Sequence, residues 1–333
     1  MTDITEASPA SAGAGATTLG VRGRTTKAVA AAGRRYPLFR GHSRIATHLV
    51  PTGAQGPDGS TEVALRCGPR ILVRPNENVG RTIFFFGDLS PRLSSVCSRV
   101  LRPGDTVIDV GANYGVITLR AAAAVGPTGC VHAIEPQPGV AALLRRSIAM
   151  NHMDQVQVHE IALSDSDGQM SLQVPDDNLG AASLSRPLTG PGATFTVQVR
   201  TSGPFLANLS LGPVRLMKVD IEGHEPEFLR GAHDFLAAQP PDIIVIESND
   251  HIFGPTVGPI SLWERPAVQQ LTDLGYEIVA IDRTFRNLFF TGLTRFQPGR
   301  DDDFGRSEDY VAIHGSRYAG LAAELGIKDG TSR

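Results

Sequence analysis

The stretch Val107-Ile-Asp-Val-Gly-Ala-Asn-Tyr-Gly115 carries the strongest structural signal in this 333-residue chain. The apolar, β-branched run over 106–110 is typical of a strand buried on both faces, and a helix is predicted over 114–125. Between them, Gly111 has no side chain where the backbone must approach a ligand, and Gly115 allows a tight turn or close helix packing. The helix N-terminus offers free N–H groups that suit a carboxylate. The stretch therefore predicts a strand, a ligand-binding turn and a helix.

A regular alternation of strands and helices surrounds this stretch. The strands are predicted at 106–110, 131–135, 156–163, 214–220, 242–247 and 276–281, and the helices at 114–125, 138–150, 225–238 and 262–274. Two later strands are predicted at 287–290 and 310–313. This alternation indicates an α/β, Rossmann-like fold with a mostly parallel, doubly wound sheet and right-handed crossovers. Ligands in such sheets bind beyond the carboxyl ends of the strands.

The flanks of this domain have a different character. The predicted divisions are a flexible tail at 1–30, a small β-rich extension at 31–86, the main domain at 87–315 and a C-terminal tail at 316–333. Within the extension, short strands are predicted at 45–50, 62–67 and 70–74, and a helix follows at 89–101. An insertion at 166–213 holds two alternating segments, 170–174 and 194–200, around a Gly/Ser/Pro-rich centre at 180–192. It is either a lid over a substrate or an ordinary β extension.

Composition narrows the classes of function. The chain has 31 Lys+Arg and 34 Asp+Glu, for a net charge of -3, so no basic field exists to hold nucleic acid. No apolar run approaches the ~20 residues of a membrane span, and the N-terminus lacks the apolar core of a secretion signal. The three cysteines are far apart and suit a reducing compartment. We expect a cytoplasmic protein with no nucleic-acid partner and no membrane span; homo-oligomerisation stays open.

Polar residues near the glycine turn predict a cofactor site. Asp109 and Asn113 add polar groups at the edge where Tyr114 begins the helix. Glu135 ends the next predicted strand, about 20 residues after the glycine turn, where an acidic residue can accept hydrogen bonds from both hydroxyls of a ribose. Pro136 fixes the exit of the chain from that strand.

The segment Ala162-Leu163-Ser164-Asp165 follows the third predicted strand. A side chain or backbone group of Ala162, Ser164 or Asp165 can meet an adenine edge there, and a simple turn explains the segment equally well.

Four segments together resemble the FkbM family of methyltransferases. They are 109–115 (DVGANYG), 133–136 (AIEP), 162–165 (ALSD) and 218–225 (KVDIEGHE). The last is the most specific to that family, whereas the others are shared more widely among class I methyltransferases. The resemblance covers roughly 87–290. It implies a class I methyltransferase fold, S-adenosylmethionine as cofactor, and O-methylation of a hydroxyl on a sugar or secondary-metabolite acceptor, as in natural-product biosynthesis.

A second polar cluster predicts where the methyl acceptor binds. Lys218, Asp220 and Glu222 alternate at the end of a predicted strand, so they project to one side. Three charges there are costly unless they are paired or form a site. Methyl transfer mainly requires alignment, and a general base helps an alkyl hydroxyl to react. We predict that the catalytic residues are Lys218, Asp220, Glu222 and His224, and that Asp220 also lies near the cofactor. The first candidates for the general base are Asp220 and His224, and His251 is a further candidate.

Carboxylates at two neighbouring strand ends also suit a divalent cation. Glu247 ends a neighbouring predicted strand, with Asn249 and Asp250 close behind, so Asp220 and Glu247 are expected on adjacent strand ends. Oxygen ligands of this kind suit Mg²⁺, which holds a diol and lowers its pKa. Hydrogen bonds to the cofactor or substrate explain the two carboxylates equally well, so we assign no metal ligands from the sequence.

Three other classes of function fit the sequence less well. A nicotinamide-dependent oxidoreductase is disfavoured because the turn does not match G-x-G-x-x-G. A non-catalytic nucleotide-binding module fits poorly with the charged Lys218-Asp220-Glu222 edge. A nucleic-acid methyltransferase lacks the Asn-Pro-Pro-Tyr or Asp-Pro-Pro-Tyr element for a flipped base, whereas a peptide acceptor stays open. Three aromatic residues are available to stack on an acceptor: Trp263, Phe253 and Tyr114.

Overall fold

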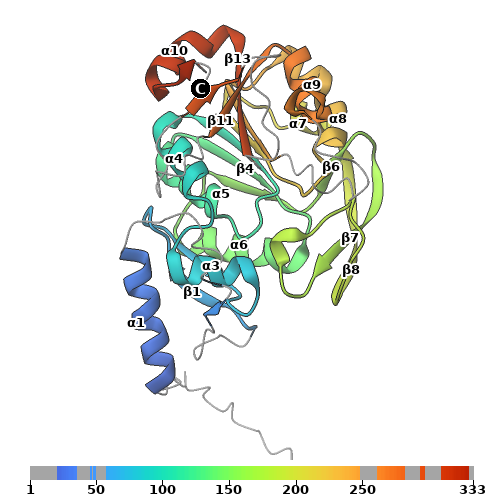
Figure 1. The fold of residues 1–333 in the computed structure, drawn as a ribbon. Helices are drawn as coiled ribbons and strands as arrows, with labels where there is room; N and C mark the ends of the chain where they lie inside the picture. The colour runs from blue at the N-terminus through green and yellow to red at the C-terminus, as the bar shows by residue number, and fades with distance from the viewer. Residues whose placement is uncertain are drawn as a thin grey trace, which may run out of the picture.

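A nine-stranded sheet forms the centre of the part of the chain that the structure describes (Figure 1). The structure is a computed structural model, and it describes residues 21–35, 46, 48–49, 58–247, 261–281, 293–296 and 309–329. The predicted strand at 287–290 lies outside these residues, as do Asn249, Asp250, His251 and Phe253.

The strand order of this sheet is β14-β12-β11-β13-β10-β9-β3-β4-β5. The strands are β3 (Thr106–Val110), β4 (Cys130–Ile134), β5 (Val156–His159), β9 (Val214–Val219), β10 (Ile243–Glu247), β11 (Tyr276–Ile281), β12 (Leu293–Arg295), β13 (Asp309–His314) and β14 (Lys328–Asp329). The neighbours from β5 to β10 are all parallel, whereas β13 runs antiparallel to both β10 and β11. The predicted Rossmann-like, mostly parallel sheet is confirmed, and the chain leaves β3 first toward β4 and later returns on its other side as β9.

Helices cover both faces of the sheet. Their bounds are α4 (Pro91–Val100), α5 (Val116–Val125), α6 (Pro138–Met150), α7 (Ser202–Ala207), α8 (Glu225–Ala238), α9 (Pro266–Asp273) and α10 (Gly315–Leu325), with a short 3-10 turn η3 (Leu262–Glu264) before α9. In Figure 1, α4 and α5 lie on one side of the sheet and α8 and α9 on the other. No helix in the described ranges is long and apolar enough to cross a bilayer.

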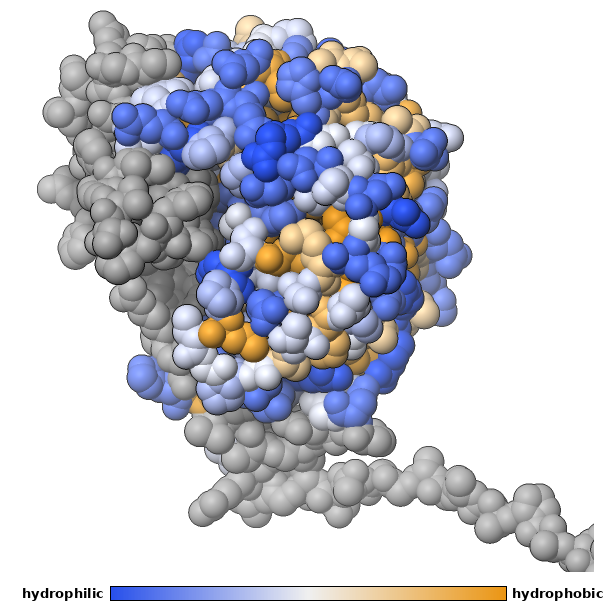
Figure 2. All heavy atoms as spheres, turned by 90° about the vertical axis from the view of Figure 1, so that its right-hand side faces the viewer, coloured by the Kyte–Doolittle hydropathy of each residue, from blue (hydrophilic) through white to orange (hydrophobic). Residues whose placement is uncertain are grey.

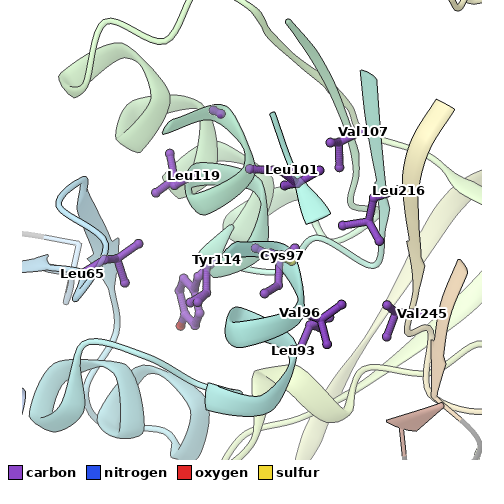
Figure 3. Close-up of a cluster of buried hydrophobic side chains, with 14 of the residues drawn as sticks. Leu65, Leu93, Val96, Cys97, Leu101, Val107, Tyr114, Leu119, Leu216 and Val245 are labelled. Carbon is purple, nitrogen blue, oxygen red and sulfur yellow. The ribbon is translucent and has the colours of Figure 1, made fainter. Parts of the chain in front are cut away.

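Successive residues of each central strand face two different cores. Val107 and Leu216 point to the core beneath α4 and α5, while Ile108 and Met217 point to the core beneath α8. Figure 3 shows the first of these cores, where the α4 side chains Leu93, Val96 and Cys97 meet the sheet. Burial on both faces explains why these strands are continuous apolar runs rather than alternating ones.

The two strands of the insertion join β6, which lies just before it, in a separate three-stranded sheet with strand order β6-β8-β7. The strands of this sheet are β6 (Ala162–Ser164), β7 (Gly168–Pro175) and β8 (Gly192–Thr201), with a 3-10 turn η1 (Leu179–Ala181) after β7. The predicted antiparallel pair is confirmed as β7 and β8. The single strand predicted at 156–163 is wrong: the chain leaves the central sheet after His159, and β6 pairs with β8 instead. Figure 2 shows that hydrophilic side chains surround smaller apolar groups on this side of the molecule.

The N-terminal extension departs most from expectation. Its hairpin, β1 (Thr61–Ala64) and β2 (Arg70–Val73), confirms two predicted strands, but Ala46 and His48 are helical where a strand was predicted. Helix α1 (Val21–Arg35) occupies residues assigned partly to a flexible tail. Helix α3 (Asn78–Phe86) was missed because its apolar end, 83–86, is compatible with a strand or a helix. Tertiary contacts decide the choice, since seven residues of α3 are buried.

The C-terminal segment is not a tail over its described part. Helix α10 buries Leu321 and Leu325 against the sheet, and β14 pairs in parallel with β12. The prediction of a tail at 316–333 is therefore wrong through residue 329, because apolar side chains at helical spacing anchor the segment.

Candidate functional site

The predicted cofactor and acceptor residues meet at the carboxyl ends of β3, β4, β9 and β10. Asp109 of β3 lies opposite Lys218 of β9, and Val110 lies opposite Ile134 at the end of β4. The backbone N–H groups of Gly111 and Ala112 both donate to the Ile134 carbonyl at 3.0 Å. The site therefore sits where the chain order reverses in the sheet, the usual ligand position in a doubly wound fold.

The glycine turn is pressed directly against the end of β9. Gly111 has φ +79°, and a Cβ at this position would lie 1.8 Å from the Asp220 carbonyl oxygen. Neither the backbone conformation nor the space admits a side chain. The turn that precedes α5 is thereby held at a fixed place beside Asp220, which joins the cofactor side of the site to the acceptor side.

Asn113 and Gly115 shape the start of α5. Asn113 adopts a left-handed conformation at φ +51°, and its side-chain Oδ1 accepts a hydrogen bond from Tyr114 N at 2.7 Å. Gly115 is the N-cap and supplies no side-chain hydrogen bond to the helix. The N–H groups of the first turn are therefore available to a ligand with negative charge.

Glu135 is the buried acid of the site. The residue is only 5% exposed, and its two carboxylate oxygens accept backbone N–H groups from Asn113 at 2.7 Å and Gln137 at 2.8 Å. Burial raises the pKa of Glu135 to about 7 despite these hydrogen bonds. Each carboxylate oxygen has a further lone pair, so Glu135 has the capacity to accept two hydroxyl groups of a ribose.

Tyr114 does not face a ligand. Its ring is fully buried in the core that α5 shares with the N-terminal extension, as Figure 3 shows, and its hydroxyl donates to Glu77 Oε1 at 3.1 Å. The suggestion that this ring stacks on an acceptor is therefore wrong. Only the backbone of Tyr114 remains for a cofactor contact.

Glu77 is a positioning residue that the sequence analysis missed. Its buried carboxylate caps α3, accepts the Leu179 N–H at 3.1 Å from the insertion, and receives the Tyr114 hydroxyl. Leu179 in turn accepts a hydrogen bond from Asn113 Nδ2 at 3.4 Å. Glu77 thus ties the extension, the cofactor turn and the insertion together. No motif signals this role, because the partners that it ties to α3, Tyr114 and Leu179, are distant in the sequence.

Several buried polar atoms near the glycine turn before α5 have no hydrogen-bond partner within the described residues. They are Arg74 Nε, Asn78 Oδ1, Gln137 Oε1 and Asn178 Oδ1. Asn78 and Asn178 flank the contacts of Glu77, and Gln137 follows Glu135. Unpartnered buried groups require an explanation, and a polar cofactor bound at the α5 N-terminus would supply one. The residues present therefore fit a cofactor with ribose and amino-acid groups.

The side chains of the segment 162–165 contact residues of, or next to, α8. Ser164 Oγ lies 2.9 Å from His224 Nε2, and Asp165 pairs with Arg230 at 3.0 Å. Arg230 holds the pKa of Asp165 below its usual range. Both side chains are thus used at the junction between β6 and α8. An adenine contact from Ala162, Ser164 or Asp165 stays a prediction.

Lys218 is an internal cation. Its ammonium donates to the Gly111 carbonyl at 2.7 Å and lies 3.4 Å from one oxygen of Asp109 and of Asp220. Burial alone would lower the pKa of Lys218, but the two carboxylates raise it above its usual value. Asp109 is completely buried and accepts the Thr118 hydroxyl at 2.6 Å. Lys218 and Asp109 therefore brace the glycine turn rather than face a ligand.

Three carboxylates converge beside this pair. One oxygen each from Asp220, Glu222 and Glu247 lies within 4.8 Å of the other two. Burial and the negative charge of Asp220 raise the pKa of Glu222 to about 7, and burial with the charges of Asp220 and Glu222 raises the pKa of Glu247 well above its usual value. The predicted proximity of Asp220 and Glu247 is confirmed.

His224 is not exposed to an acceptor. It is 3% exposed, and its two ring nitrogens face serine hydroxyls, Nε2 at 2.9 Å from Ser164 Oγ and Nδ1 at 2.8 Å from Ser185 Oγ. Burial lowers the pKa of His224. The geometry contradicts its selection as a candidate base, because both nitrogens are already used to join β6 to the insertion.

The insertion contacts the acceptor edge through Ser183 and Arg186. The Ser183 hydroxyl donates to the Glu222 carbonyl at 2.8 Å, the Arg186 Nε donates to the same carbonyl at 3.1 Å, and the Arg186 guanidinium pairs with the Glu222 carboxylate. Glu225, the last residue of the 218–225 segment, accepts the N–H groups of Ile221 and Gly223 and so fixes the same turn. These contacts place the loop 176–191 against the acceptor side of the site.

The family model and the two relatives that this chain matches are all described as methyltransferases. A family model described as the methyltransferase FkbM domain matches residues 109–278. Methyltransferase 1 of Beauveria bassiana is 27% identical over 151 residues, covering 40% of this chain and 60% of that protein. The 31-O-demethyl-FK506 methyltransferase FkbM of Streptomyces tacrolimicus is 31% identical over 163 residues, covering 40% of this chain and 62% of that protein. The chain thus spans about three fifths of the length of both relatives.

A solved structure carries the same family description. The methyltransferase FkbM from Methylobacillus flagellatus KT aligns with a TM-score of 0.34 and 15% sequence identity, covering 72% of this chain and 66% of that one.

Proposed function

Because the chain belongs to the FkbM methyltransferase family, we propose that it transfers a methyl group from S-adenosylmethionine to a hydroxyl of a small sugar or secondary-metabolite acceptor. The matched domain covers 109–278, which includes the glycine turn, Glu135 and the acidic edge. The observation that carries the proposal is the buried carboxylate of Glu135 beside the uncapped N-terminus of α5. We also place this activity in the cytoplasm, and the free thiols of Cys67, Cys97 and Cys130 support that location.

On the cofactor side, each end of S-adenosylmethionine has a matching group. Glu135 would accept the two ribose hydroxyls, because its remaining lone pairs face no other donor among the residues described. The N–H groups at the start of α5, to which Gly115 supplies no side-chain cap, would hold the methionine carboxylate. The bound cofactor supplies a methyl group on a positively charged sulfur, already attached to a good leaving group.

On the acceptor side, Asp220 is the accessible carboxylate. Its side chain is 36% exposed, whereas Lys218 is 8% exposed and Glu222 is paired with Arg186. The acceptor oxygen would form a bond to the methyl carbon as the carbon–sulfur bond breaks, and that electron pair would stay on sulfur to give S-adenosylhomocysteine. The hydroxyl proton passes to the Asp220 carboxylate. Lys218 remains an ammonium because its pKa is raised, so it holds Asp220 in place and does not act as a base.

We further propose that the insertion acts as a lid over the acceptor. Its contacts with Glu222 and His224 close one side of the acceptor edge. Closure of such a segment excludes water, which would otherwise compete with the acceptor hydroxyl for the same position.

The proposal is tested first by calorimetry. Purified protein titrated with S-adenosylmethionine and with S-adenosylhomocysteine is expected to bind both with micromolar affinity, whereas NADH in a parallel titration is expected to give no heat. Methyl transfer from labelled cofactor to a panel of hydroxylated sugars and macrocycles then identifies the acceptor class. Binding of NADH in place of both sulfur compounds would refute the proposal in favour of an oxidoreductase.

The role of the base is tested by two isosteric substitutions. Asp220→Asn is expected to lower the methyl-transfer rate by about 10²–10⁴-fold, the usual contribution of a general base, with a smaller change in cofactor affinity. His224→Gln keeps groups that can bond to Ser164 and Ser185, so its rate is expected to stay within about tenfold of the original protein. The opposite order of effects would return the role of base to His224.

A further inference from the structure

We propose that Asp220, Glu222 and Glu247 form a binding site for a divalent cation of the Mg²⁺ or Mn²⁺ type. One oxygen from each residue lies within 4.8 Å of the other two. Oxygens that share one Mg²⁺ at about 2.1 Å lie at most about 4.2 Å apart, so a small movement of the side chains closes the site around an ion. The role of the cation in catalysis rests on the proposed function, whereas the site itself does not.

The backbone brings the three carboxylates to one place. Asp220 and Glu222 follow β9, and Glu247 ends β10, which runs parallel to β9 with Ile246 opposite Val219. Glu222 adopts a left-handed conformation at φ +57°. A non-glycine residue seldom holds this conformation without local support. Here the support comes from two donors on its carbonyl, the Ser183 hydroxyl and the Arg186 Nε.

Glu247 provides a second, independent sign of a missing partner. Its Oε2 atom is shielded from solvent and has no hydrogen-bond partner in the described ranges. A buried carboxylate oxygen left in this state is costly. In native structures such an atom points to a strained group or to a bound ion or water.

The charges of the residues around the cluster also favour a bound cation. Lys218 faces Asp109 and Asp220, each at 3.4 Å, and Arg186 faces Glu222. No described cation pairs with Glu247. The cluster therefore has more carboxylates than cations, and hard oxygen ligands without nitrogen or sulfur favour Mg²⁺ or Mn²⁺ over zinc.

A cation here would act on the acceptor. Mg²⁺ takes six oxygen ligands and keeps several waters when a protein supplies only a few carboxylates. An acceptor hydroxyl, or two neighbouring hydroxyls of a sugar, can replace those waters. A hydroxyl bound to a divalent cation loses its proton more readily, so the site would select acceptors with a free hydroxyl or diol beside the reacting oxygen.

The test is a Mn²⁺ titration of the full chain followed by electron paramagnetic resonance, after treatment with a chelator. We expect the free Mn²⁺ signal to stay below that of a protein-free titration until one ion is bound per chain. Mg²⁺ is expected to restore the signal by competition. Loss of a partner of a metal ligand weakens affinity about 10–100-fold, so the isosteric Glu247→Gln is expected to weaken Mn²⁺ binding at least that much. Asp234→Asn, at an exposed carboxylate of α8, is the matched control and is expected to bind Mn²⁺ like the original protein.

The outcomes separate the proposal from its alternative. No Mn²⁺ binding by the original protein at millimolar metal, or equal binding by Glu247→Gln, would overturn the site and leave a proton shared among the carboxylates. Circular dichroism and S-adenosylhomocysteine binding check that Glu247→Gln is folded; if it is not, Asp220→Asn takes its place with the same expectation. The titration contains no methyl donor or acceptor, so metal binding without methyl transfer supports the site while refuting the proposed function.

Discussion

Replacing Glu135 by glutamine is expected to reduce affinity for S-adenosylhomocysteine by about 10²–10⁴-fold, because two charge-assisted hydrogen bonds to ribose hydroxyls contribute about 1.5–3 kcal/mol each. Glutamine has nearly the same shape, but it carries no charge and offers only one acceptor oxygen. The other position becomes an amide that faces the N–H of Asn113 or Gln137. Alanine removes both anchors of the glycine turn, so Glu135→Ala is expected to abolish measurable binding.

Calorimetry at constant pH checks this result. Glu160→Gln is the matched control, because Glu160 is an exposed carboxylate that pairs with Arg145 on the surface. It is expected to bind S-adenosylhomocysteine like the original protein. Retention of full affinity by a folded Glu135→Gln would show that the ribose lies elsewhere, and the cofactor half of the proposed function would then fail.

The pH dependence of binding follows from the same carboxylate. Burial raises the pKa of Glu135 to about 7 in the folded protein, above its usual 4.5, so its ionised form opposes folding as the pH rises through that range. Ribose hydroxyls donate to the ionised form and favour it. Affinity for S-adenosylhomocysteine is therefore expected to rise, by up to about tenfold per pH unit, below pH 7 and to level off above pH 8. Glu135→Gln should have lost this dependence.

The central sheet could be predicted from the sequence because its signals are local. The strands 106–110 and 276–281 and the helices 138–150 and 225–238 coincide with β3, β11, α6 and α8. Each is a long apolar or periodic run with turn residues at its ends, and the pattern alone determines its type. The elements that failed depend on distant contacts. Leu163 enters β6 because it packs beneath α8, and no local pattern contains that information.

The residues of the candidate site also fall into those that local spacing predicts and those that depend on distant contacts. The spacing of Lys218, Asp220 and Glu222 placed them together on one edge, and the structure agrees. Spacing does not reveal which way a side chain faces once its neighbours fold, so Tyr114 and His224 were assigned to ligands although both are buried against protein groups. Glu77 could not be found because its partners, Tyr114 and Leu179, are brought to it only by the fold.

Replacing Lys218 by methionine is expected to lower the free energy of unfolding by about 3–5 kcal/mol, the usual cost of breaking a buried ion pair from one side. Methionine fills a similar volume but leaves the Asp109 carboxylate without its cation, and Asp109 has no exposed surface on which water can compensate. The Gly111 carbonyl also loses its donor. The loss is expected across pH 6–9, because the pKa of Lys218 is raised and the ammonium persists throughout that range.

Urea unfolding followed by circular dichroism measures this loss within a double-mutant cycle. Asp109→Asn removes the carboxylate charge that Lys218→Met leaves unpaired. The double variant is therefore expected to lose about 1–3 kcal/mol less unfolding free energy than the sum of the losses in the two single variants. Arg146→Met, which breaks the exposed pair with Asp58, serves as control and should cost less than about 1 kcal/mol. If Lys218→Met unfolds like the control, the pair does not brace the glycine turn, and the fixed position of Gly111 against Asp220 must then come from backbone contacts alone.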